Sequence, residues 1–236
     1  MQVKSPYLSF LNQHCMATIS NDTFKFLKDL SKNNNKEWFT ANKKRYETAK
    51  ADFEAFVTEL IKNIAKFDPS INGLEAKKAI FRIYRDTRFS KDKTPYKINM
   101  GASLSNTPGK IHDHAGYYIH IEPGKSFLAG GAYEPQSPWI GKIRQEIDYN
   151  TAEFKKIISA AAFKKNFGEI KGEKLKTVPK GFPKDHPELG LLQYKSFLLV
   201  HDCNDKTVTS EAFMKHVTGI YKSMVPFNAF LNRAAD

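Results

Sequence analysis

The chain has 236 residues, of which 41% are hydrophobic and 13% aromatic. This composition excludes a disordered chain, and the length suits one large domain or two small ones. The net charge of +12 suggests attraction to anions such as nucleic acid, phosphates or acidic metabolites.

The first fifteen residues have no periodic pattern, and their apolar residues are interrupted by Pro6 and by polar side chains. They suit neither a signal peptide nor a membrane span. We expect residues 1–15 to be a disordered or dispensable extension, because Met16 begins an ordinary capped helix start. Two cysteines are too few for a disulfide scaffold, so we expect lone thiols, a cytoplasmic location and no membrane partner.

Helical patterns come first along the chain. Apolar spacing of three and four residues predicts a helix over about 22–32, capped by the polar residues 20–22 and ended by the asparagines 33–35. A second stripe predicts a longer helix within 36–66 that faces the core.

Strand patterns follow from Lys78. Alternation predicts a strand over 78–86, a second from about residue 96, and a hairpin that turns at 122–125. Tyr118, His120 and Glu122 share one face of the hairpin. The pair Gly130-Gly131 indicates a bulge or a close approach by another backbone or a ligand.

The last third is again mainly helical. Ser137-Pro138 predicts a helix to about Ile147, and a capping-box pattern predicts another over 151–165. A basic connection over 168–187, a short helix to Gln193 and a strand over 195–200 precede a final helix that Pro226 should kink or divide. The order predicts a single α+β domain over 16–236, with an antiparallel sheet in the middle flanked by N-terminal and C-terminal helices.

The segment RIYRDTRFSKDKTPYK, residues 82–97, holds six Lys or Arg against two Asp, with three aromatic residues among them. The planar fork of arginine gives two charge-assisted hydrogen bonds to phosphate or carboxylate. The segment therefore predicts a focused site for a ligand that bears such a group, formed by Arg82, Arg85, Arg88, Lys93 and Tyr96.

Other functions stay open. An enzyme acting on a small anionic substrate would use Asp86, Tyr96 or His120 to move protons, and Asp86 is expected more often to pin an arginine. A nucleic-acid-binding module is the second alternative, since aromatic residues beside arginines suit stacking on bases. The third is structural, with the arginines paired to Asp86, Asp92 and acids such as Glu122.

No metal or cofactor is expected. The pair His112 and His114 lacks a third ligand at a suitable spacing, and the other histidines are scattered. His120 faces either the arginine site or solvent. Cys203 follows His201 closely but is expected to be structural. Gly130-Gly131 lacks the strand and helix context of a nucleotide-binding loop.

The string R-x-x-R-D-x-R-F-x-x-D-K-x-x-Y, here Arg82 to Tyr96, resembles the signature of a bacterial family of uncharacterised proteins that also occurs within longer fungal proteins. The pieces NNNKEWF, GYYIHIEPGKSFLAGG and LKTVPKGFPKDHP are similar to it as well. The resemblance spans nearly all of the chain from Met16. It implies that the basic motif is shared, and it implies no activity.

Overall fold

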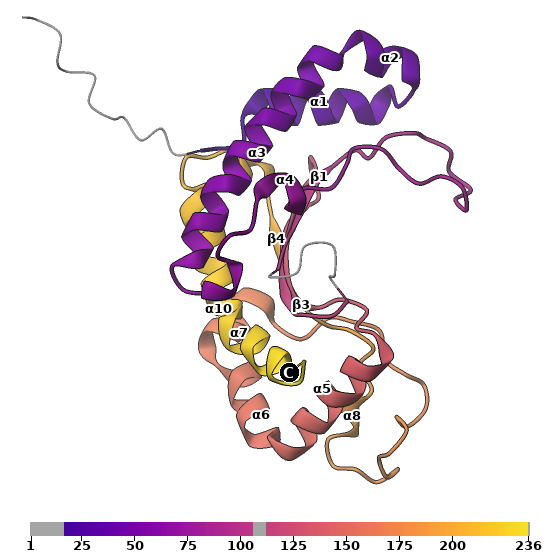
Figure 1. Cartoon of the computed structure of the whole chain (residues 1–236), viewed down its shortest axis with the longest axis vertical. Coiled ribbons are helices and arrows are strands. Elements are labelled where there is room, and N and C mark those ends of the chain that lie inside the picture. Colours follow the sequence, from indigo (N-terminus) through magenta and orange to yellow (C-terminus); the bar gives the residue numbers. More distant parts are fainter. Residues whose placement is uncertain (1–16, 106–111, 236) are drawn as a thin grey trace, which may run out of the picture.

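The computed structural model describes residues 17–105 and 112–235, so the expected extension over 1–15 lies outside the described residues. Helices come first, a four-stranded antiparallel sheet lies in the middle, and helices follow it (Figure 1). The predicted α+β class is confirmed. No helix among the described residues is long and apolar enough to cross a membrane.

The N-terminal helices are α1 (Asn21–Lys32), α2 (Lys36–Ala41) and α3 (Lys43–Ala65). The hydroxyl of Ser20 caps α1 and the side chain of Asn35 caps α2, as short polar side chains commonly do. The pattern over 36–66 predicted one helix, and this is wrong in detail. The chain breaks at Asn42, whose side chain donates to the carbonyl of Trp38.

The sheet has the order β1-β2-β3-β4. The hairpin of β2 and β3 is confirmed, with its turn between residues 121 and 126. The strand expected over 195–200 is longer and extends to Cys203. The strand bounds are β1 (Met100–Leu104), β2 (Gly116–Ile121), β3 (Ser126–Ala132) and β4 (Phe197–Cys203).

One face of the sheet packs on α3 and on the long helix α10 (Phe213–Arg233), while α4 (Ala76–Ala79) contacts β1 on the same side (Figure 1). Polar contacts fix α10 to β2, since Tyr221 donates to the carbonyl of Tyr118 at 2.8 Å and Asn228 donates to that of Gly116 at 3.1 Å. The sequence predicted that Pro226 kinks or divides this helix, and the structure shows one helix continuous through Pro226, so the proline does not divide it. The buried residues Met224 and Phe227 hold both sides of the proline on the core.

The predicted strand over 78–86 is also wrong in detail. Residues 76–79 form α4, and the next residues are extended but pair only through single bridges, Ile80 to Ala102 and Tyr84 to Tyr96. The run expected from residue 96 becomes a strand only at Met100. The alternating pattern indicated extended backbone correctly but could not show that it leaves the sheet.

The paired glycines behave as their positions predicted. Gly131 has a φ of +111°, and a Cβ there would collide with the carbonyl oxygen of Phe197 on β4. A Cβ on Gly130 would meet Met224 of α10. The backbone of β4 therefore approaches Gly131 closely, and helix α10 packs closely on Gly130.

The helices within residues 137–192 surround the lower end of the sheet in Figure 1. The capping box expected for 151–165 does not form, because the amide of Asn150 donates to Glu146, and the helix is divided at Ala160. The bounds are η1 (Pro69–Ile71), α5 (Ser137–Tyr149), α6 (Thr151–Ser159), α7 (Ala161–Phe167), α8 (Leu189–Leu192) and α9 (Asp205–Val208).

Candidate anion-binding cleft

Residues 80–97, which we call the arm, form an irregular ribbon that projects from the edge of β1 (Figure 1). Backbone hydrogen bonds close the ribbon, from Arg85 N to Pro95 O at 3.0 Å and from Lys97 N to Ile83 O at 2.7 Å. A third bond, from Phe81 N to Gly101 O at 2.9 Å, joins the arm to the sheet. The basic segment is thus held at its base and extends away from the sheet toward its tip.

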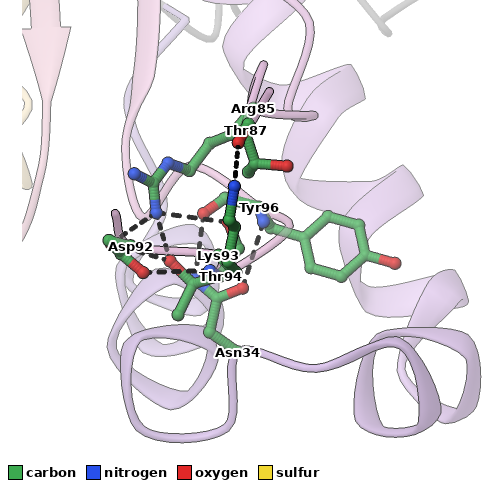
Figure 2. A network of polar contacts seen from close by, with 7 residues as sticks. All are labelled: Asn34, Arg85, Thr87, Asp92, Lys93, Thr94 and Tyr96. Carbon is green, nitrogen blue, oxygen red and sulfur yellow. Dashed lines mark hydrogen bonds and ion pairs between the residues drawn. The ribbon is translucent and has the colours of Figure 1, made fainter. Parts of the chain in front are cut away.

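The base of the arm is anchored on the N-terminal helices. The ring of Tyr96 is 5% exposed and stacks on Phe39 with centroids 3.9 Å apart. The side chain of Asn34 accepts from Tyr96 N at 3.1 Å and donates to Tyr96 O at 2.9 Å (Figure 2). Burial raises the pKa of the Tyr96 phenol. Its ring points away from Arg85 in Figure 2, so packing is the role that the geometry gives this side chain.

The arginines find acids within the arm. Arg88 donates from Nε and Nη2 to the two oxygens of Asp86, at 3.0 and 2.7 Å, and these hydrogen bonds lower the pKa of that carboxyl. Arg85 Nη1 lies 2.6 Å from Asp92 Oδ2 and also donates to Thr94 (Figure 2). The backbone N–H of Thr94 and the Arg85 guanidinium bring the pKa of Asp92 to about 2.

These pairs are not buried. The side chain of Arg88 is 76% exposed and that of Asp86 45%, so the pair contributes little to stability. Asp86 pins an arginine, the commoner of its two expected roles. Lys93 donates to the carbonyl of Thr87 at 2.9 Å (Figure 2). Arg82 is exposed and has no ion-pair partner among the described residues.

A polar depression of about 430 Å³ lies between the arm and the sheet. Its cations are Arg85 and Lys97, and Phe81, Asp86, Asn99, Tyr118 and His120 complete the lining. Lys97 lies 5.2 Å above the ring centroid of Phe81, and burial, with Arg82 nearby, lowers the pKa of its ammonium group. No carboxylate of the described residues is within ion-pair distance of Lys97. Asp86 is the carboxylate that lines the same depression, and it forms an ion pair with Arg88.

His120 faces this depression, which decides between its two expected positions. Its Nε2 lies 3.0 Å from Glu122 Oε2, and its Nδ1 lies 3.1 Å from the hydroxyl of Tyr118. A carboxylate only accepts, so Nε2 carries a proton and donates it to Glu122, while Nδ1 is within hydrogen-bond distance of the Tyr118 hydroxyl and, at 3.3 Å, of Asn99 Nδ2. Burial raises the pKa of Tyr118 to about 12. Glu122 therefore orients His120 and does not neutralise the arginines.

The polar depression adjoins an apolar hollow of about 530 Å³ on the face of the sheet opposite α10. The two share Phe81 and Tyr118, whose ring centroids are 6.1 Å apart. The hollow is also lined by Phe127, Ala129, Leu198 and Val200. Gly101 leaves space for the Tyr118 ring, because a Cβ at that position would lie 2.7 Å from the phenol oxygen. We call the depression and the hollow together the cleft.

His112, His114 and His186 contact different groups. His112 contacts the carbonyls of Tyr133 and Glu134, and His186 lies 2.9 Å from Asp148. His114 lines the hollow, and its buried Nδ1 has no hydrogen-bond partner among residues 17–105 and 112–235. His112 and His114, which the sequence offered only as a weak metal-binding pair, therefore make different contacts.

Sequence reasoning found Arg85, Asp86 and His120 but gave no role to Lys97, Asn99 or Tyr118. The alternation in β2 signalled that Tyr118, His120 and Glu122 share a face, although it did not show what they face. Lys97 is part of the basic segment, but the sequence could not show that it is partly buried in the depression while Lys91 and Lys93 are exposed.

A family model described as a conserved hypothetical protein (DUF2461) matches residues 22–230 of the chain. No curated protein and no solved structure matches the chain.

Proposed function

We propose that this chain, which belongs to the conserved hypothetical protein family DUF2461, binds a small ligand that carries a phosphate or carboxylate group and an apolar or aromatic portion. The observation that carries the proposal is the continuity of the cleft. Two cations, Arg85 and Lys97, line one end, and the apolar hollow begins on the other side of Phe81 and Tyr118.

The charges support an anion at the polar end. Lys97 is partly buried beside Arg82, and two like charges close together repel unless an anion neutralises them. Arg85 uses Nη1 for Asp92 and Thr94, and its Nε and Nη2 have no partner among the described residues. Asn99 adds an amide at the same end, whose nitrogen contacts Nδ1 of His120 at 3.3 Å and has a second N–H to donate. A doubly charged oxyanion would receive charge-assisted hydrogen bonds from all three side chains.

The apolar end supports a ligand larger than a free ion. Ligand sites are mostly apolar concave surfaces with a few polar groups that fix orientation, and a hollow of about 530 Å³ is within the usual range for a small molecule. The aromatic rings of Phe81 and Tyr118, where the depression meets the hollow, and of Phe127 within the hollow suit contact with a flat ring or a short hydrocarbon chain. The anion would then position the ligand and the hollow would select it.

Binding of nucleic acid along the surface has less support. A second basic region, residues 151–184 with nine Lys against three Glu, lies at the opposite end of the molecule from the arm (Figure 1). Several lysines there and nearby are paired with acids, as Lys155 is with Glu188 and Lys171 with Glu169. The two regions lie apart, so a long polyanion would have to span the distance between them to contact both.

Proton transfer in the cleft is a second candidate function. The Tyr118 hydroxyl, the His120 imidazole and the Glu122 carboxylate form a row of hydrogen-bonded groups, as in sites where a carboxylate orients a histidine that acts as a base. The side chains of His120 and Glu122 are only 15% exposed. His120→Gln separates the two candidates when phosphate release from phosphate monoesters is measured. Turnover by the wild type that His120→Gln abolishes would support catalysis, and no turnover by the wild type would leave binding alone.

Thermal melts test the proposed binding. Because a ligand that binds only the folded state stabilises it, phosphate at matched ionic strength should raise the Tm of the wild type by about 2–6 °C. Lys97→Gln should lose most of this rise. Lys91→Gln removes the same charge from an exposed position of the arm and should retain it. Arg88→Gln should also retain it, because the Arg88 guanidinium is occupied by Asp86.

The proposal would be contradicted if Lys91→Gln and Lys97→Gln lost the rise equally, since the effect would then be one of general charge. It would also fail if neither phosphate, sulfate nor a carboxylate changed the Tm of the wild type.

A further inference from the structure

A cluster of three ligand-type side chains lies on the other side of the sheet from the cleft. His201 and Cys203 are two residues apart on β4, so their side chains share the face that packs on the helices. His216 comes from the first turn of α10. The sequence shows the spacing H-x-C of His201 and Cys203. It could not show that His216, which lies on a separate helix, comes close to them, because only the fold brings the three together.

The distances suit a shared metal ion. Nε2 of His201 lies 3.2 Å from Nε2 of His216, and Sγ of Cys203 lies 4.0 Å from the same nitrogen. All three ligand atoms are within 4.8 Å of one another. Tetrahedral zinc with bonds of about 2.0 Å to nitrogen and about 2.3 Å to sulfur has ligand atoms about 3.3–3.6 Å apart. Small side-chain shifts would therefore complete the geometry.

A second contact orients one of the ligands. Nδ1 of His201 lies 2.9 Å from the carbonyl oxygen of Asn166 on α7. A carbonyl only accepts, so Nδ1 carries the proton and the lone pair of Nε2 points into the cluster. Metal-bound histidines are commonly held by such a contact. The amide of Asn166 also donates to Ser223 of α10 at 2.9 Å, which fixes α7 against α10 beside the cluster.

From this geometry we propose that His201, Cys203 and His216 bind a zinc ion that joins β4 to α10, with water in the fourth position. Two imidazole nitrogens and one thiolate favour zinc over calcium or magnesium, which take oxygen ligands. The site lies on the helix-covered face, so it is independent of the cleft and of the function proposed for it. The proposal differs from the two expectations that Cys203 is structural and that no metal is bound.

The test uses untagged full-length protein freed of metal by a chelator and titrated with Co²⁺, which takes zinc sites and absorbs visibly. The expected result is one Co²⁺ per chain, a thiolate-to-cobalt charge-transfer band, and the visible bands of four-coordinate cobalt. Cys203→Ser should abolish the charge-transfer band, and His216→Gln should weaken binding at least tenfold. Cys15→Ser, which removes the other thiol, and His112→Gln should leave the titration unchanged.

Zinc should also raise the Tm of the wild type by about 5–10 °C at a hundredfold excess over its Kd, and Cys203→Ser should lose that rise. Circular dichroism checks that each variant is folded. The proposal is overturned if the wild type shows no charge-transfer band, or if the band persists in folded Cys203→Ser. In either case the two histidines form a simple hydrogen bond beside a packed thiol.

Discussion

Replacing Gly131 with alanine is expected to lower the free energy of unfolding by about 4 kcal/mol. The φ of +111° is unfavourable for any residue with a Cβ and costs about 1–3 kcal/mol. The collision with the carbonyl oxygen of Phe197 adds about 1–3 kcal/mol of overpacking. Gly131 pairs with both Gly116 and Leu198, so the strand cannot move without disturbing two ladders.

Gly124→Ala is the matched control. Gly124 also has a positive φ, +78°, but nothing lies within 4 Å of the position that a Cβ would take. This variant should lose only the conformational part, about 1–2 kcal/mol. Urea denaturation of both variants measures the difference. A loss of less than about 1 kcal/mol for Gly131→Ala would show that β4 does not approach β3 as described.

Truncating Tyr96 to alanine should cost about 3–5 kcal/mol, the usual loss when a buried aromatic ring is removed. The ring stacks on Phe39 and lies 5.5 Å from the ring of Tyr84. Tyr96→Phe keeps the ring and removes only the hydroxyl, which has no hydrogen-bond partner among the described residues. It should therefore change the stability by less than about 1 kcal/mol and retain the phosphate-dependent rise in Tm.

The pair of variants decides the role of this motif tyrosine, because the sequence offered it both as an anion ligand and as a packing residue. Stability curves and phosphate-dependent melts are measured for both. If Tyr96→Phe were as stable as the wild type but insensitive to phosphate, the hydroxyl would be a ligand after all and the packing role would be incomplete.

The sequence predicted most of the fold because local patterns were strong. The alternation over 116–132 and the turn within it located the hairpin, and Ser20 located the start of α1. The failures have one physical cause, which is that tertiary contacts override local preference. Residues 80–86 alternate like a strand but leave the sheet, and the packing of Met224 and Phe227 carries α10 through a proline.

The candidate site was less predictable. The basic segment indicated where cations gather, but charge alone could not separate Arg88, whose fork is occupied by Asp86, from Lys97, which is partly buried without an acid. That difference depends on which residue lies at the base of the arm and which near its tip. His201 and His216 could not be paired from sequence at all, because one is on a strand and the other on a helix.

The central claim is that an anion binds at the polar end of the cleft. The most direct measurement is a phosphate titration followed by ¹H–¹⁵N NMR at constant ionic strength. The predicted result is a saturable shift of the amide signals of residues 97–99 and 118–120, with the imidazole of His120 responding at the same phosphate concentration. Shifts confined to the lysine-rich residues 164–184, or spread in proportion to exposed charge without saturation, would contradict the claim.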